Sequence, residues 1–435
     1  MTTAGAAEAL MSPGLAPAKL RVLLLILQFP PDVNSNGTLM AQVGEELTAR
    51  GHQVSVVTTF PHYARFQIAD GYRGKLFERA AYGSMDVLRL WVYASGTKQR
   101  MAHRLFSYLS FNVLAAVAGI MSRRRFDVVL SPNGSFFTGI TAQLLRIFKG
   151  MPFIYNVQDL YPETPVAAGQ LKSRPAIATL GRVERHMYRA ANAITVITPS
   201  FRDNIVSKGI LHAKVRVIPN FVDTEFIRPL PKVNSFSERL GLADKFVVLH
   251  AGNVGYVYDL ETLLDAAVLL RDDPSIVFVI NGEGVAKATL ERKVEALGLT
   301  NVRFLPFQSR DDLPLLRASA DVQVSLYRHN AARFSMPSKI YEIMASGRPL
   351  LASADADSDV ARLVHATGCG ICVEPEDARA LADALRNLRH DPLGCASMAD
   401  EGRRHAVDSY SRGRVGEQYE ILLREVVSAH TLPRS

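Results

Sequence analysis

Cysteine is scarce in this sequence, with three residues among 435, at positions 369, 372 and 395. Cys369 and Cys372 have the separation found in zinc knuckles and redox pairs, but no second cysteine pair and no nearby pair of histidines completes a zinc site. An odd and low number of cysteines is typical of proteins in a reducing compartment. We therefore expect ordinary thiols, and a scaffold built on disulfides is excluded.

The sequence also lacks the motifs of several large classes of protein. It has no Walker motif, no complete Gly-x-Gly-x-x-Gly fingerprint and no basic-aromatic motif of a nucleic-acid-binding module, so we expect no nucleic-acid partner. Residues 1–18 lack a basic segment, and the apolar run at 21–28 is short and leads into a loop, so no signal peptide is expected there. The Ala- and Pro-rich residues 1–18 are predicted to form a flexible extension.

Long apolar runs are equally few. The most apolar helical run, residues 105–121, has seventeen residues and includes Asn112, which makes it marginal for spanning a bilayer. Two interpretations remain open: a core helix packed on a sheet, or a helix that places one face in a membrane. The second draws on the basic residues that flank the run, namely Lys98, Arg100, Arg104, Arg123, Arg124 and Arg125.

Charge is distributed unevenly along a chain of otherwise globular composition, 48% hydrophobic and 21% charged. Residues 1–225 contain 25 Lys and Arg against 14 Asp and Glu, whereas residues 226–435 contain 25 against 28. The first half therefore carries a net charge of +11 and the second −3. A basic half suggests an anionic partner such as a membrane surface, a phosphorylated acceptor or nucleic acid. The alternative is a merely solvated basic surface.

The order of apolar runs predicts an α/β protein with two Rossmann-like, doubly wound domains facing a cleft. A buried strand at 21–28, a turn-rich loop, an amphipathic helix ending at Gly51 and a second strand open the first half. The same order restarts at 246–251 with "FVVLHAG". Prolines interrupt the pattern at 218–233. We predict an N-terminal domain at 19–225, a C-terminal domain at 226–410 and a C-terminal helix within 411–435 that crosses back to the first domain.

The stretch "FSMPSKIYEIMASGRPLLAS", residues 334–353, has the most chemical content. Ser338 is placed to cap a helix that runs from about Lys339 to Ser346 and stops at Gly347. Lys339 and Glu342 are three residues apart and share one side of its first turn. Lys339 suits a diphosphate and Glu342 suits paired hydroxyls, as in a ribose. The alternative is a surface Lys–Glu pair of little energetic weight.

Three glycine-containing loops are predicted at the carboxyl ends of strands. They are "NSNG" at 34–37, "GNVG" at 252–255 and "NGEG" at 281–284. Doubly wound sheets bind ligands at this edge, and glycine permits close approach of the backbone to a phosphate or a sugar. Each loop alone is a weak signal, but their common placement predicts one ligand site.

Taken in order, "FPPDVNSNG", "NVQDLYPET", "VIPNFVDTEFIRP", "AGNVG", "NGEG" and "PSKIYEIMASGRPLLAS" resemble retaining glycosyltransferases of the family-4 type. The resemblance spans about residues 20–410. It is strongest to the branch that builds bacterial surface polysaccharides, including colanic-acid and O-antigen fucosamine transferases. It implies the GT-B fold, a nucleoside-diphosphate sugar in the second domain, an acceptor in the first, and no divalent metal or other cofactor.

The resemblance also implies roles for individual residues. Lys339 is the catalytic cation, with Asp159 and Glu163 as candidates to hold or orient the acceptor hydroxyl; an alternative for both carboxylates is a structural role. Glu342 matches the second Glu of the family's Glu-x7-Glu motif and holds the ribose. The implied donor-binding set is Gly37, Asn253, Gly255, Gly282, Glu283, Gly284, Pro306, Phe307, Arg333, Ser335, Met336, Ser338, Lys339 and Glu342.

Three departures from the family pattern stand out. Phe334 occupies the place of the first Glu of that motif, so backbone groups of Ser335 and Met336, or an unusual donor sugar, must compensate. Asn253 stands where the family has an Arg, which shifts diphosphate binding to Lys339 and Arg333. Gln158 replaces the usual His before Asp159. Each departure concerns the sugar, the diphosphate or the acceptor, and none concerns the fold.

The expected reaction transfers a sugar from a UDP-linked donor, with retention, to a lipid-linked saccharide of the undecaprenyl-diphosphate type. The basic first half then predicts a cytoplasmic protein peripheral to the inner face of the cytoplasmic membrane. Two alternatives remain: a nucleotide-sugar 2-epimerase of the same fold, and a non-catalytic partner that binds a nucleotide sugar.

Overall fold

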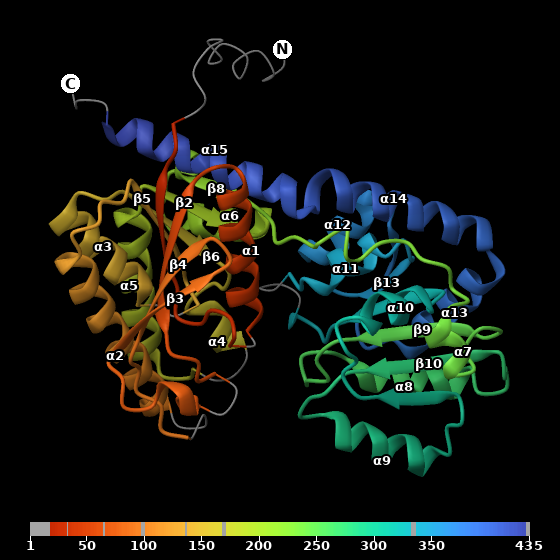
Figure 1. The fold of residues 1–435 in the computed structure, drawn as a ribbon. Helices are drawn as coiled ribbons and strands as arrows, with labels where there is room; N and C mark the ends of the chain where they lie inside the picture. The colour runs from red at the N-terminus through yellow and green to blue at the C-terminus, as the bar shows by residue number, and fades with distance from the viewer. Residues whose placement is uncertain are drawn as a thin grey trace, which may run out of the picture. The chain divides into compact units, whose positions relative to one another are not determined.

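A computed structural model describes residues 18–32, 34–63, 66–96, 101–134, 137–167, 171–331 and 336–431 (Figure 1). The predicted extension at 1–18 lies almost wholly outside this range, as do Arg333, Phe334 and Ser335. The chain divides into two compact units. The first runs to Asn156 and adds Ala190–Ala193 and the chain from Glu420 onward; the second comprises Val157–Arg189 and Ile194–Tyr419.

An eight-stranded sheet has the order β3-β4-β2-β1-β5-β6-β7-β8. Its strands are β1 (Arg21–Leu25), β2 (Gln53–Thr59), β3 (Phe77–Tyr82), β4 (Met85–Leu90), β5 (Val128–Pro132), β6 (Phe153–Val157), β7 (Ala193–Val196) and β8 (Val215–Val217). β3 is antiparallel to β4, whereas β4, β2, β1, β5 and β6 are parallel to one another. The helices of this half are α1 (Ser35–Ala49), α2 (Met101–Met121), α3 (Thr138–Lys149), α4 (Glu163–Ala167), α5 (Arg174–Ala190) and α6 (Pro199–Ser207).

A second sheet of six strands has the order β11-β10-β9-β12-β13-β14, and all its pairs are parallel. Its strands are β9 (Phe246–Ala251), β10 (Ile276–Asn281), β11 (Val302–Leu305), β12 (Val322–Leu326), β13 (Leu350–Ser353) and β14 (Gly370–Val373). The helices are α7 (Ser235–Arg239), α8 (Leu260–Leu269), α9 (Lys287–Leu297), α10 (Asp312–Ala318), α11 (Lys339–Ala345), α12 (Asp359–Thr367), α13 (Ala378–His390), α14 (Pro392–Tyr410) and α15 (Arg412–Thr431). The predicted domain boundary at 225/226 falls between β8 and β9.

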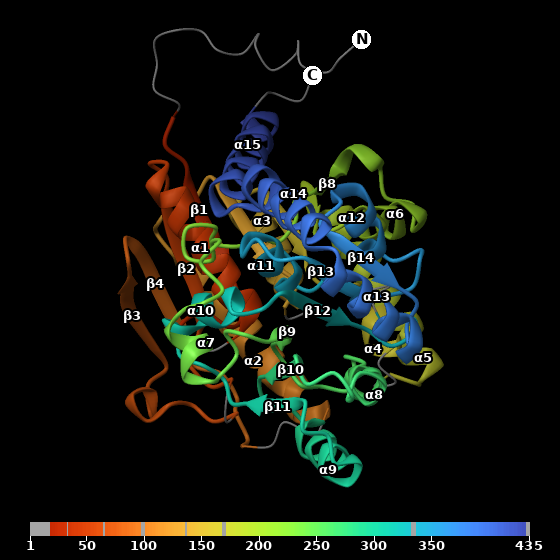
Figure 2. The ribbon, with the colours of Figure 1, turned by 90° about the vertical axis from the view of Figure 1, so that its right-hand side faces the viewer.

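Both faces of the second sheet are buried, which explains why its strands are continuous apolar runs rather than alternating ones. Val248 and Phe278 pack into one core with α8 and α13, and Val247 and Val277 pack into the opposite core with α7 and α10. Figure 2 shows these two pairs of helices on opposite sides of the sheet. The predicted α/β class with two parallel, doubly wound sheets is confirmed.

Helix α2 contains the apolar run at 105–121 and has two different faces. One face packs on α3, where Thr141 donates a hydrogen bond of 2.8 Å to the side chain of Asn112. The other face is exposed and includes Phe106 and a row at every fourth residue: Leu105, Leu109, Val113, Val117 and Met121. Within the described residues, His103–Met121 is the one stretch long and apolar enough to cross a membrane, by length and composition only, and a third of it is buried.

The last helix, α15, joins the first unit through its C-terminal half. There the Glu420 carboxylate accepts hydrogen bonds from Arg424 and lies 3.2 Å from His52. The pKa of Glu420 is lowered by the hydrogen bonds from Arg424 and His52, although partial burial opposes this. Arg424 also donates a hydrogen bond of 2.9 Å to the carbonyl of Ala18, ahead of strand β1.

Candidate functional site

The loops that follow β9, β10 and β11 lie side by side at one edge of the second sheet. Ala251 is in register with Asn281, and Asn281 is in register with Leu305, so the three strands end together. The Gly252 amide donates to the carbonyl of Asn281 at 2.9 Å, and the Gly282 amide donates to that of Leu305 at 3.0 Å. This is the carboxyl edge at which parallel α/β sheets bind ligands.

The glycines of these loops are required by contacts between the loops themselves. A Cβ atom on Gly282 would lie 1.8 Å from the Gly252 carbonyl oxygen, and one on Gly284 would lie 2.2 Å from that of Val254. Gly252 and Gly282 have φ angles of 143° and 147°, which side chains strongly disfavour. The predicted reason for glycine was close approach to a ligand, whereas the structure shows close approach of one loop to the other.

Lys339 begins helix α11 and is buried, with 9% of its surface exposed. Its ammonium nitrogen lies 3.7 Å from the centre of the Tyr258 ring and 5.7 Å from that of Tyr327. No described residue accepts a hydrogen bond from it. The pKa of Lys339 is lowered to about 7, chiefly by burial and also by the positive charge of Arg317, while Glu342 opposes both. Lys339 is therefore held among aromatic rings rather than in an ion pair.

Glu342 forms its ion pair with Arg317, a residue of α10. The Arg317 side chain is almost fully buried and donates a second hydrogen bond of 2.7 Å to Gln323 on β12. About a third of the Glu342 side chain remains exposed. The alternative of a surface Lys339–Glu342 pair is therefore wrong, because Lys339 is buried and Glu342 has another partner.

The predicted capping role of Ser338 is also wrong. Ser338 has helical angles, φ −60° and ψ −25°, and its side chain forms no capping hydrogen bond. The turn begins one residue earlier, where the Pro337 carbonyl accepts a hydrogen bond of 3.2 Å from the Ile340 amide. Because α11 has only seven residues, the charge of Lys339 is a stronger feature of this site than the helix terminus.

The remaining donor-site residues are distributed as follows. Met336 is buried beside the start of α11, and Pro306 and Phe307 are exposed after β11. Asn253 and Glu283 are exposed, and Glu283 is paired with Lys287 at 2.7 Å. Gly37 belongs to the first unit, where a Cβ atom would lie 2.7 Å from the Gln28 carbonyl oxygen. Gly255 is buried; Arg333 and Ser335 lie outside the described residues.

The two candidate carboxylates after β6 differ in their surroundings. Asp159 reaches solvent, and partial burial raises the pKa of its carboxyl. Glu163 forms an ion pair of 2.8 Å with Lys208, which also binds the buried Glu184 at 2.7 Å. Glu163 thus has a structural partner, in line with the structural alternative weighed for it.

Three residues of this site were not singled out from the sequence: His250, Tyr258 and Arg317. His250 is completely buried on β9, and burial together with the charge of Lys339 lowers its pKa well below the usual value. These three residues come from separate elements and share no sequence motif with Lys339. The available signal was the pair of tyrosines in "GYVYDL", directly after the glycine loop at 252–255.

The three cysteines are free thiols, and burial raises the pKa of Cys372 to about 11. No group of three or more His, Cys, Asp or Glu side chains in the described part of the chain is arranged to hold a metal ion.

Comparison with known families assigns both halves of the chain. Residues 37–220 match the glycosyl transferase 4-like domain, and residues 234–405 match the glycosyl transferases group 1. The chain belongs to the family-4 glycosyltransferases. The predicted family is therefore confirmed, and the edge described above lies within the group 1 match of this glycosyltransferase.

Two relatives illustrate the similarity. A glycosyltransferase of Escherichia coli named for colanic acid biosynthesis, WcaI, is 27% identical over 376 residues, which is 84% of this chain and 91% of the relative. A D-inositol 3-phosphate glycosyltransferase of Salinispora tropica is 31% identical over 355 residues, which is 77% of this chain and 70% of the relative.

Solved structures agree on the GT-B fold of this glycosyltransferase. Sucrose-phosphate synthase from Thermosynechococcus elongatus matches with a TM-score of 0.74 and 19% identity, over 94% of this chain and all of its own. HepE from Anabaena, solved in complex with UDP, matches with a TM-score of 0.70 and 16% identity, over 93% of this chain and all of its own.

The packing of the glycine loops leads to a first prediction. Gly282→Ala will destabilise the second unit by more than 2 kcal/mol, because the added methyl meets the Gly252 carbonyl in a region of φ that Ala avoids. The measurement is the midpoint of urea unfolding followed by circular dichroism.

The matched control is Gly298→Ala. Gly298 also has a positive φ, 61°, but nothing lies within 4 Å of its Cβ position. This variant reports backbone strain alone, about 1 kcal/mol. Equal losses in the two variants would show that contact between the loops does not explain Gly282.

Proposed function

We propose that this glycosyltransferase transfers a sugar with retention from a nucleoside-diphosphate donor, UDP-linked, to a lipid-linked saccharide in surface polysaccharide biosynthesis. The observation that carries the proposal is Lys339, a buried cation without a carboxylate partner at the carboxyl edge of the second sheet. The UDP complex of HepE supports a uridine donor, and the name of the colanic acid relative supports a polysaccharide product.

The charge arrangement around Lys339 suits a leaving diphosphate. Arg317 is a second buried cation whose charge acts on Lys339, and Glu342 already neutralises it. When Lys339 is protonated, no described carboxylate therefore neutralises its charge, and the charge is available to a ligand. A transition state in which a phosphate leaves is stabilised most by a cation that is already in position and shielded from water. The exposed third of Glu342 is available to the ribose hydroxyls while Arg317 holds the side chain in place.

The proposed reaction needs no protein nucleophile. The bond between the anomeric carbon and the diphosphate oxygen breaks, and the acceptor oxygen forms its bond on the same face. The acceptor hydroxyl loses its proton to the leaving phosphate oxygen, so charge and atoms balance. Lys339 stabilises the negative charge on the diphosphate, and Asp159 orients the acceptor hydroxyl. Glu163 has a structural role through Lys208. No metal ion takes part in this proposal, because Lys339 supplies the positive charge.

A lipid-linked acceptor requires the enzyme to work at a membrane surface. The exposed apolar face of α2 and the basic residues that flank it, Arg123, Arg124 and Arg125, support peripheral binding to the cytoplasmic face of an anionic membrane. Binding of this kind uses one face of the helix and leaves its α3-facing side packed.

The activity is tested by a screen of donors. The protein is incubated with a panel of nucleotide sugars and short lipid-diphosphate saccharides, and products are identified by mass. We expect one donor to yield a saccharide longer by one sugar, with an α-configured donor giving an α-linkage. Epimerised free nucleotide sugar without transfer would instead identify a 2-epimerase, and binding without turnover would identify a non-catalytic partner.

The role of Lys339 is tested by Lys339→Met, which keeps most of the volume among the tyrosine rings. We expect kcat/KM to fall by about 10²–10³-fold, ~3–4 kcal/mol, through weaker donor binding as well as a lower kcat. The control is Lys287→Met, since Lys287 is paired with Glu283 beside the same edge and should change kcat/KM less than about threefold. Unchanged turnover in Lys339→Met would remove this residue from the mechanism.

The lowered pKa of Lys339 predicts a pH dependence of donor binding. In the free enzyme the pKa is about 7, so the protonated fraction falls as the pH rises above that value. The diphosphate binds the protonated form, and donor affinity will therefore decrease above pH 7, by up to about tenfold per pH unit. Calorimetry between pH 6 and 9 measures this. Lys339→Met should bind weakly with no such slope, and a flat profile in the native enzyme would contradict the assignment.

A further inference from the structure

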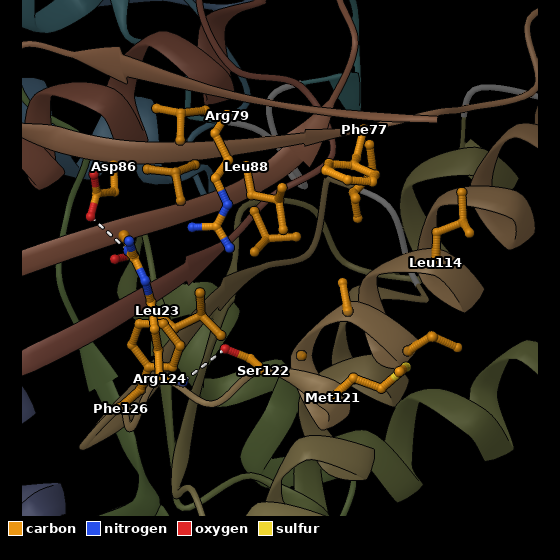
Figure 3. A pocket seen from close by; sticks show the side chains of 18 of the residues that line it. Leu23, Phe77, Arg79, Asp86, Leu88, Leu114, Met121, Ser122, Arg124 and Phe126 are labelled. Atoms are coloured by element: carbon orange, nitrogen blue, oxygen red, sulfur yellow. Dashed lines mark hydrogen bonds and ion pairs between the residues drawn. The ribbon is translucent and has the colours of Figure 1, made fainter. Parts of the chain in front are cut away.

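The first unit contains a cavity of about 750 Å³ that none of the donor-site residues lines (Figure 3). It lies between the C-terminal end of α2 and one face of strands β1, β2, β4 and β3. This volume is within the range of small-molecule sites.

The floor of the cavity is a continuous apolar face of the sheet. Strand register places Arg79 opposite Leu88, Leu88 beside Val57, and Phe77 opposite Leu90. Side chains in register point to the same side of a sheet, so these residues face the cavity together. Leu114, Val117 and Met121 of α2 form the facing wall.

The mouth of the cavity is unusually apolar for a surface. Phe77 is 62% exposed, Val117 48% and Met121 76%, and all three line the cavity. Val117 and Met121 are also the last two members of the exposed row on α2 that begins at Leu105. The apolar surface of the helix therefore leads directly into the cavity. Exposed apolar surfaces of this kind mark sites for ligands, partners or membranes.

The charges at the cavity are predominantly positive. Arg79, Arg123 and Arg124 line it, and Asp86 is its one carboxylate. Asp86 is neutralised by Arg124 at 2.6 Å. Figure 3 shows the guanidinium of Arg79 extending into the cavity between Leu88 and the Asp86–Arg124 pair. Among the described residues, Arg79 has no carboxylate within ion-pair distance. An apolar lining with an uncompensated cation is complementary to a hydrocarbon chain that carries an anionic head.

We infer that this cavity binds the phosphate-proximal part of the isoprenoid chain of the lipid-linked acceptor, with Arg79 facing the anionic head. The identity of the lipid rests on the proposed function, whereas the affinity for an anionic amphiphile rests on the cavity itself. The site therefore holds the carrier lipid, separately from the donor sugar at the edge of the second sheet.

The single tryptophan of the protein provides a direct readout. Trp91 is partly exposed, and its amide donates a hydrogen bond of 2.9 Å to the carbonyl of Leu76, a residue of the cavity lining. The full chain is titrated with geranylgeranyl diphosphate, geranylgeraniol and inorganic diphosphate, each below its aggregation threshold. Trp91 emission and calorimetry follow binding. We expect saturable binding of geranylgeranyl diphosphate, at least tenfold weaker binding of the alcohol, and no change in Trp91 emission with inorganic diphosphate, whose proposed site is at Lys339 in the second unit.

Variants fill the cavity or remove its charge. Leu88→Phe and Val117→Phe add a ring from opposite walls and should each weaken binding of geranylgeranyl diphosphate at least tenfold. Ile147→Phe is the matched control, since Ile147 is exposed on α3 and does not line the cavity. Arg79→Gln should remove the preference for the diphosphate over the alcohol, whereas Arg73→Gln, an exposed site outside the cavity, should retain it.

Several outcomes would overturn the inference. One is binding of geranylgeranyl diphosphate that Leu88→Phe and Val117→Phe leave unchanged. A second is that the native protein binds no isoprenoid. A third is that sedimentation shows a dimer of the native protein that Val117→Phe abolishes, which would identify this face as a dimer interface. Circular dichroism of each variant confirms that the fold is retained.

Failure of this inference is distinguishable from failure of the proposed function. Transfer to a soluble saccharide acceptor does not require a lipid in the cavity, and the filling variants should leave that rate unchanged. With a lipid-linked acceptor, they should raise KM for the acceptor at least tenfold at unchanged kcat. Transfer without isoprenoid binding would overturn the cavity assignment alone. Isoprenoid binding without transfer to any acceptor would overturn the proposed function alone.

Discussion

The second unit depends on one electrostatic constraint, the burial of the Lys339 ammonium without a carboxylate beside it. Removing an unpaired charge from water costs several kcal/mol, which is why the pKa falls to about 7. The face of Tyr258, 3.7 Å away, offsets part of this cost through its quadrupole. Neutralisation by Glu342 is prevented because Arg317 engages it. A diphosphate that arrives at this edge therefore meets a cation with no competing partner.

The loops around Lys339 are held rigid by their own contacts. Gly282 and Gly284 allow the β10 loop to lie directly against the β9 loop, and two backbone hydrogen bonds join them. Tyr258, which covers the ammonium, belongs to the same β9 loop. Substitution of these glycines would thus displace the aromatic ring as well as the backbone, so the stability of this edge and the surroundings of Lys339 are coupled.

The sequence was sufficient to predict strands that are buried on both faces of a sheet, because such strands, for example β9 and β10, are unbroken apolar runs. It revealed neither β4 nor the antiparallel strand β3, whose side chains alternate between exposed and half-buried at the edge of the sheet. Lys339 and Glu342 could be chosen from their spacing, but their partners could not. Arg317 and Tyr258 lie on other elements, and only the sheet order brings them to α11. Ser338 failed as a cap because the turn starts at Pro337, which local sequence alone does not determine.

The missed strand β3 matters for the first unit as well, because Phe77 and Arg79 are its contribution to the cavity. Without it, the apolar run of α2 offers a choice between a core helix and a membrane helix. The structure shows a helix that packs against α3 on one side and presents a row of large apolar residues on the other. Where that row ends at Met121, apolar residues of β3 and β4 continue the apolar surface into the cavity. Arg79 of β3 adds a positive charge that has no carboxylate partner among the described residues. A helix that lies on a flat bilayer needs only the row of apolar residues, whereas the apolar cavity lined by Arg79 matches the proposed site for one isoprenoid chain with an anionic head.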